Sequence, residues 1–164
     1  MTMQPDMSKV FEWNTYFERS GSRDDDAVRI AALHQEAKGF LTSFKWCVAV
    51  EEEYVGFIFP GIVGVFLFKI QGISEAIDEW VWIVVGDLPP AYITCEESPN
   101  PATALDSYMG AMREWIEAID RGDSVDGLIP VNAPATRETA KQLAARLKFI
   151  DENILSGYDE DLKA

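Results

Sequence analysis

The chain holds one histidine and two cysteines, residue types that often act as general base or nucleophile. His34 stands in HQEAK, one helical turn before Lys38, which does not match the two-histidine zinc motif HExxH. A single histidine cannot build the usual tetrahedral zinc site. Although an imidazole is a capable general base, a histidine beside a helix stripe is most often structural or exposed. We therefore predict no catalytic role for it.

The two cysteines, Cys47 and Cys95, each lie close to a run of glutamates. Negative neighbours raise the pKa of a thiol and make it a poorer nucleophile. A pair of Cys47 with His34 would need two groups that lie roughly 20 Å apart along one helix and its exit. Two cysteines are also too few for a disulfide framework. The sequence predicts no catalytic residue and no cofactor.

Three acidic runs remain: 24–26, 51–53 and 96–97. Carboxylates suit Mg²⁺ and Ca²⁺, but the spacing matches no EF-hand. Charges beside apolar strands more often oppose edge aggregation. The common nucleotide-binding and hydrolase fingerprints are also missing from the sequence. We predict no metal site.

The elements that position these groups centre on an uncharged run of 15 residues, Tyr54 to Phe68. A membrane-spanning helix needs about 20 residues, and Pro60-Gly61 would break one. The other residues are mostly Val, Ile, Phe and Tyr, which favour strands. The run predicts two strands, 54–59 and 62–70, that meet at Pro60-Gly61.

A second apolar stretch, 80–85, alternates Trp80, Trp82 and Val84 with Val81, Ile83 and Val85. Both faces of this strand are apolar, which is typical of a central strand. We expect helices on one face and either more chain or a second subunit on the other. After the break at Pro89-Pro90, residues 91–95 predict a short strand.

Apolar residues at three- and four-residue spacing predict three helices, 24–44, 100–121 and 136–155. Asn100-Pro101 is a good start for the second. The predicted class is α+β: a small, mostly antiparallel sheet of three to four strands packed against three main helices. We expect a single α+β domain at 24–157, preceded by an N-terminal arm, 1–23, with a short helix near 10–17, and followed by an acidic tail, 158–164.

The net charge is −14 with a pI near 4.3. A negative field repels phosphate backbones and anionic lipid, so we expect neither nucleic acid nor membrane as partner. The N-terminus lacks the layout of a signal peptide, and the two cysteines form no framework. We expect a cytoplasmic protein with free thiols.

Six residues form the predicted partner site: Glu51, Glu52, Glu53, Tyr54, Asp87 and Tyr92. If the two segments lie at one end of the sheet, they make an acidic patch with aromatic residues, suited to a basic protein. Alternatively, both tyrosines belong to the core.

The segments FLFKI, DEWVWIVVGDLPPAYIT and LIPVNAPATRETAKQLAARLKFI occur in this order. Over residues 31–161 the chain resembles a family of small bacterial cytosolic proteins with no assigned function. The resemblance implies one cytosolic domain and carries over no catalytic residue. The acidic single domain is also similar, by analogy alone, to proteins that neutralise toxins.

The first hypothesis is a non-enzymatic acidic binding module, for example an immunity-type protein that neutralises a basic toxin or effector. The second is an enzyme or small-ligand protein with a pocket between sheet and helices. The third is a homo-oligomeric structural protein, such as a homodimer, suggested by the second apolar face of strand 80–85.

Overall fold

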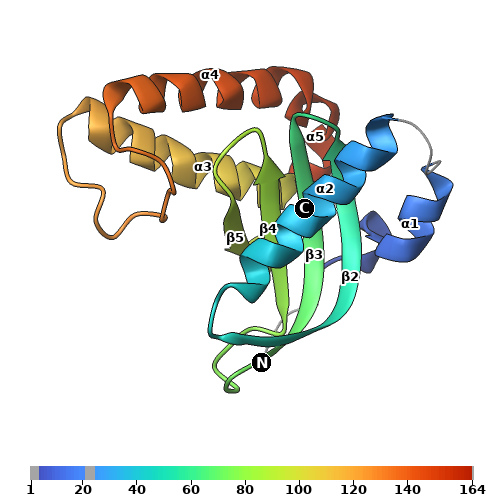
Figure 1. The fold of residues 1–164 in the computed structure, drawn as a ribbon. Coiled ribbons are helices and arrows are strands. Elements are labelled where there is room, and N and C mark those ends of the chain that lie inside the picture. Colours follow the sequence, from blue (N-terminus) through green and yellow to red (C-terminus); the bar gives the residue numbers. More distant parts are fainter. Residues whose placement is uncertain (1–3, 21–24, 164) are drawn as a thin grey trace.

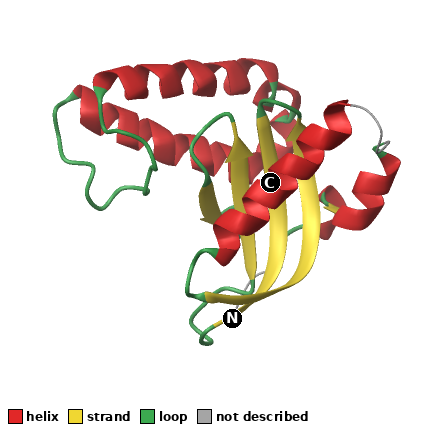
Figure 2. Ribbon diagram, viewed as in Figure 1, coloured by secondary structure: helices red, strands yellow, loops and turns green. Residues whose placement is uncertain are grey.

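An antiparallel meander between two helical layers forms the centre of the protein (Figures 1 and 2). The computed structural model describes residues 4–20 and 25–163. Its strands follow one another in the order of the sequence: β1 Phe11–Glu12, β2 Cys47–Phe59, β3 Val63–Gly72, β4 Trp80–Gly86 and β5 Ala91–Thr94. Its α-helices are α1 Trp13–Arg19, α2 Asp25–Thr42, α3 Pro101–Asp120, α4 Arg137–Asn153 and α5 Asp159–Leu162.

The α+β class and the antiparallel sheet are confirmed, and the expected three to four strands and three main helices are matched only roughly. The described ranges hold five strands and five α-helices. The α-helices besides the three main ones are α1 and α5. Within the N-terminal arm, Phe11 pairs with Val55 as part of β1, and the short helix begins only at Trp13. A strand of two residues is too short to show the alternation of apolar and polar residues by which a strand is predicted from sequence.

The start of β2 is the second correction. This strand begins at Cys47, seven residues before the predicted start at Tyr54 (54 − 47). Its pairing with β3 shifts between Cys47 and Ala49, between Val50 and Glu52, and again further on. Such bulges interrupt the alternation of apolar and polar residues by which a strand is recognised.

The turn between β2 and β3 lies where Pro60-Gly61 predicts it. Gly61 has a φ of 78°, and the Ile62 amide donates to the Phe59 carbonyl over 2.9 Å. Proline at the second position and a positive φ at the third match a type II turn.

Both faces of β4 are buried, as its sequence predicts. Trp80, Trp82 and Val84 belong to the core with α3 and α4, whereas Val81, Ile83 and Val85 lie in the core with α2. In Figure 1, α2 crosses one face of the sheet, and α3 and α4 cover the other. The second face is therefore covered by the chain itself.

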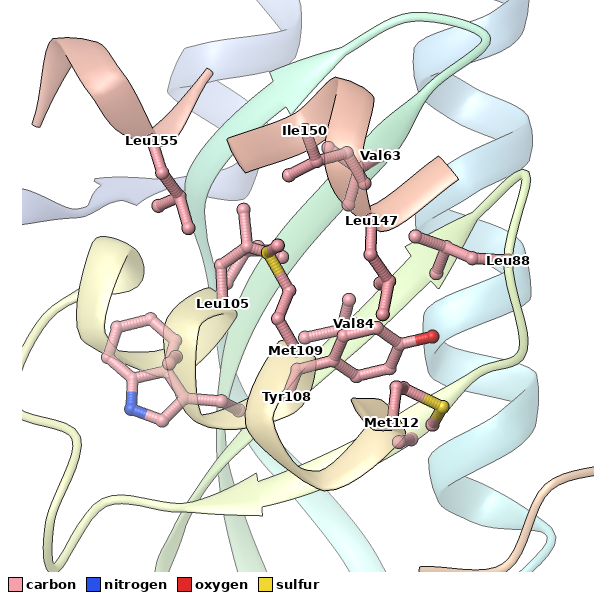
Figure 3. Packing of buried hydrophobic residues seen from close by; sticks show 14 of the residues in the cluster. Val63, Val84, Leu88, Leu105, Tyr108, Met109, Met112, Leu147, Ile150 and Leu155 are labelled. Carbon is pink, nitrogen blue, oxygen red and sulfur yellow. The ribbon is translucent and has the colours of Figure 1, made fainter. Parts of the chain in front are cut away.

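The larger core lies between the sheet and the α3–α4 pair. Figure 3 shows side chains of α3 gathered with strand residues Val63 and Val84 and with Leu147 and Ile150 of α4. Asn100 caps α3, because its side chain accepts from the Thr103 amide over 2.9 Å. The predicted helices 100–121 and 136–155 are thus confirmed to within two residues at either end.

Two buried polar groups fix the ends of β5. The Tyr108 hydroxyl donates to the Pro89 carbonyl over 2.5 Å, just before the strand. The Trp82 indole N–H donates to the Ser98 carbonyl over 2.7 Å, just after it. A buried donor without an acceptor costs about 1–3 kcal/mol, so both segments are held in place.

The tail packs against the start of α3 and against the N-terminal arm. The side-chain Nδ2 of Asn100 donates to the Asp161 carbonyl over 2.9 Å, and Lys9 lies 3.0 Å from the Asp161 carboxylate. Asp24, predicted to begin the first long helix, lies outside the described residues. No α-helix in the described ranges is long and apolar enough to cross a bilayer.

Replacing Gly86 tests how closely the end of β4 approaches the backbone at Ile62, where the turn between β2 and β3 ends. Gly86 has a φ of 140°, and a Cβ there would lie 2.4 Å from the Ile62 carbonyl oxygen. We expect Gly86→Ala to lower the free energy of unfolding by about 1–3 kcal/mol in urea titrations. Gly39→Ala is the control, because nothing lies within 4 Å of its added Cβ and α2 should gain up to about 1 kcal/mol. Equal losses in both variants would contradict this assignment.

Candidate functional site

The predicted patch residues on β2 lie on two faces of the sheet. The Tyr54 hydroxyl donates to the Glu52 carboxylate, which together with burial raises the pKa of Tyr54 to about 12. Lys69 lies 3.4 Å from Glu52 on the same face. Glu53 pairs instead with residues of α2 on the other face, and Glu51 is exposed.

Asp87 lies at the far end of the sheet. Glu52 is opposite Lys69 and Lys69 opposite Trp80, at the start of β4, whereas Asp87 follows the last residue of β4. At about 3.3 Å per residue the two carboxylates are roughly 20 Å apart. Asp87 pairs with Arg146 of α4 over 3.1 Å. The structure does not bring the two predicted segments together at one end of the sheet.

His34 belongs to a cluster that joins α1, α2 and β2. Its Nε2 lies 2.6 Å from Glu53 Oε1, and Lys38 Nζ lies 3.3 Å from Glu53 Oε2. The imidazole stacks on the Trp13 ring at 3.9 Å between centroids and 6° between planes. Burial lowers the pKa of His34, although the hydrogen bond to Glu53 acts in the opposite direction. Burial therefore favours the neutral ring, and His34 links α1, α2 and β2 through its contacts with Trp13 and Glu53.

Neither cysteine is an activated thiol. Both are buried, and burial raises the pKa of Cys47. Burial, assisted by the charge of Asp78, raises the pKa of Cys95 to about 12. A protonated, buried thiol is a poor nucleophile and a poor metal ligand. Within the described residues, no group of three or more His, Cys, Asp or Glu side chains is placed to hold a metal ion.

Tyr92 is the predicted site residue that lies in a concave, aromatic region. It is 40% exposed on β5 and contacts Phe44 and Trp46, with ring centroids 5.3 and 5.2 Å away. Phe44 also stacks on Trp46 at 4.9 Å and meets Phe40 edge-on at 5.0 Å. We call these four residues, Phe40, Phe44, Trp46 and Tyr92, the aromatic ridge.

A groove and a smaller hollow flank the aromatic ridge. The edge groove, about 580 Å³, lies between the start of β5 and the α3–α4 connection, and is lined by Phe40, Phe44, 90–92 and 127–132. The inner hollow, about 230 Å³, is lined by Trp46, 76–78, Trp80, Val81, Tyr92 and Thr94. Tyr92 lines both, so the two lie on either side of this residue, and we call them together the concave region.

Carboxylates stand at both ends of this region. Asp78 lines the inner hollow. At the other end, Leu128 of the edge groove also lines a hollow that holds Glu114, Glu117, Asp123 and Asp126, together with Arg121. Arg121 is paired with Asp123 over 2.9 Å. The region as a whole is apolar and aromatic in the middle and acidic at its ends.

Comparison with family models, curated proteins and solved structures gives no match. The geometry of this chain alone therefore carries the functional argument, and the edge groove is the candidate site. Sequence reasoning missed Phe40, Phe44 and Trp46, the residues that make Tyr92 part of a surface. Phe44 has the spacing of an inward helix residue, but α2 ends at Thr42. The signal available in the sequence was the segment FKW, which places two aromatic residues directly after a helix.

The His34 cluster should make the free energy of unfolding depend on pH. Because the pKa of the folded-state imidazole lies below the usual 6.5, the unfolded chain takes up the proton more readily. The contribution of His34 to the free energy of unfolding is therefore fully present above pH 6.5 and decreases as the pH falls below this value. Urea unfolding between pH 7.5 and 5 should show this decline in the natural chain and a smaller one in His34→Gln. Equal slopes would contradict the assignment, since this is the only histidine.

Proposed function

We propose that this protein is a non-enzymatic binding module whose edge groove takes a basic, partly apolar segment of another protein. The observation that carries the proposal is the aromatic ridge, whose rings meet one another at the surface beside a groove of about 580 Å³. Grooves of this volume lie in the range of binding sites.

The aromatic side chains favour a protein partner. Tyr, Trp and Phe are enriched at protein interfaces and supply much of their binding energy. Tyr92 is 40% exposed, and its neighbours Phe44 and Trp46 are only partly buried. Burial of these rings by a partner would remove apolar surface from water at about 25 cal/mol per Å².

The charge favours a basic partner. With a net charge of −14 and carboxylates at both ends of the concave region, the protein attracts Lys- and Arg-rich segments and repels phosphates. Glu51 and Asp87, exposed elsewhere on the sheet, add to this field at long range. A basic toxin or effector is one partner of this kind.

A small apolar ligand in the edge groove is the second candidate. The lining includes Leu128, Ile129 and Val131 with one amide side chain, Asn132, which is the composition of many ligand pockets. Native mass spectrometry of the purified protein distinguishes this candidate, because a resident ligand adds a discrete mass.

Selection from a random dodecapeptide library tests the protein-binding proposal. We expect enrichment of peptides that combine apolar residues with Lys or Arg. Tyr92→Ala should weaken the binding of an enriched peptide about tenfold or more, because the partner loses a central aromatic contact. Fluorescence titration at low and high salt measures the affinity and its expected decline with salt.

Phe11→Ala is the matched control, because Phe11 is 55% exposed on β1, at the opposite edge of the sheet. This variant should bind as the natural chain does. If Tyr92→Ala also binds unchanged, the edge groove is not the site. If the library yields no enriched peptide, the chain is not a peptide-binding module.

A further inference from the structure

Backbone pairing identifies which groups of β5 point away from the sheet. The Ile70 amide donates to the Glu79 carbonyl over 2.7 Å, and the Asp87 amide donates to the Ile62 carbonyl over 3.0 Å. Odd-numbered residues of β4 therefore bond to β3, because hydrogen-bonded pairs alternate along an antiparallel ladder. Even-numbered residues bond to β5, which pairs Trp82 with Ile93 and Val84 with Ala91.

The outward groups of β5 thus belong to Tyr92 and Thr94, the residues between and beyond those pairs. Within residues 4–20 and 25–163, no hydrogen bond from these two amides to another segment is found. The opposite edge of the sheet differs, because β1 covers part of β2. An uncovered row of backbone donors and acceptors is a template for another strand.

This edge is held rigidly. The hydrogen bonds of Tyr108 to Pro89 and of Trp82 to Ser98 fix the chain on either side of β5. A fixed edge loses little conformational entropy when it pairs with a partner.

The concave region lies where an added strand would run. A strand added to the outer edge of β5 would lie about 4.8 Å from it. The edge groove borders β5 at its start, since 90–92 and 127–132 line the same groove. The side chains of Tyr92 and Thr94 line this region as well, so their backbone and their side chains would both face the partner.

We propose that the partner segment binds in extended form as a sixth strand of the sheet, paired with Tyr92 and Thr94. This inference rests on the proposed function and specifies how the site takes its ligand. On the ridge side, alternate residues of the segment meet Phe44 and Tyr92 and are therefore apolar. Lys or Arg at its ends meet Asp78 on one side and Asp126 on the other. A second copy of the chain fits less well, because each copy carries a charge of −14.

Thr94→Pro tests the pairing. Proline removes the outward N–H and is tolerated where an edge strand faces solvent. Thr94→Ala is the matched control, since it keeps the N–H while it loses the hydroxyl and the γ-methyl group of the threonine side chain. With an enriched dodecapeptide as probe, we expect Thr94→Pro to bind about tenfold more weakly than Thr94→Ala, because only the proline variant lacks the outward N–H.

The outcomes separate the two proposals. If Thr94→Pro, shown to be folded by circular dichroism, binds as tightly as Thr94→Ala while Tyr92→Ala binds weakly, the added strand is wrong and the binding groove stands. If all three variants bind like the natural chain, the groove itself is wrong. Light scattering that shows a dimer of the natural chain, converted to a monomer by Thr94→Pro, would make a second copy the occupant and overturn the proposal.

Amide hydrogen exchange tests the same pairing without a variant. In the free protein, the amides of Tyr92 and Thr94 should exchange quickly, whereas those of Ala91 and Ile93 should be protected. Addition of the dodecapeptide should slow exchange at Tyr92 and Thr94 at least about tenfold. Unchanged exchange at saturating peptide would overturn the added strand.

Discussion

Burial of β4 on both faces is the constraint on which this structure depends. A strand without a polar face needs a helical layer on each side, and the chain supplies α2 for one and the α3–α4 pair for the other. Burial also places polar atoms where water does not reach them. The indole N–H of Trp82 and the hydroxyl of Tyr108 must then find acceptors within the protein. Both find them in the segments that flank β5, so the demands of the core determine the position of the outer strand.

Local signals made much of this fold predictable. Pro60-Gly61 identified a turn, Asn100-Pro101 identified a helix start, and the alternation at 80–85 identified a strand buried on both sides. The failures share a physical cause. The bulges in β2 disrupt its alternation, and a strand as short as β1 is defined only by its partner. These features depend on pairing between segments far apart in the sequence.

The candidate site was less predictable than the fold. Tyr92 was predicted as a partner-site residue because of the loop before it and the acidic residues grouped with it. In the structure it contacts Phe44 and Trp46, which follow the end of α2. No spacing in the sequence links these residues, because the register of β4 and β5 decides which side chains meet. The carboxylates of 51–53 depart from the prediction in the opposite way, because two predicted surface residues make structural contacts instead. Glu53 looked like part of a surface patch but is a structural partner of His34, and Glu52 is engaged by Tyr54 and Lys69.

The residues that bound β5 also bear on whether this strand edge can promote aggregation. An uncovered strand edge can recruit identical chains into fibrils, as steric zippers of six or seven residues do. Here the strand has four residues, with Pro89-Pro90 before it and Glu96-Glu97 shortly after it. Two prolines cannot extend the ladder, and two carboxylates in each copy would repel one another in a stack. The short strand, the prolines and the carboxylates all oppose the growth of a fibril from this edge.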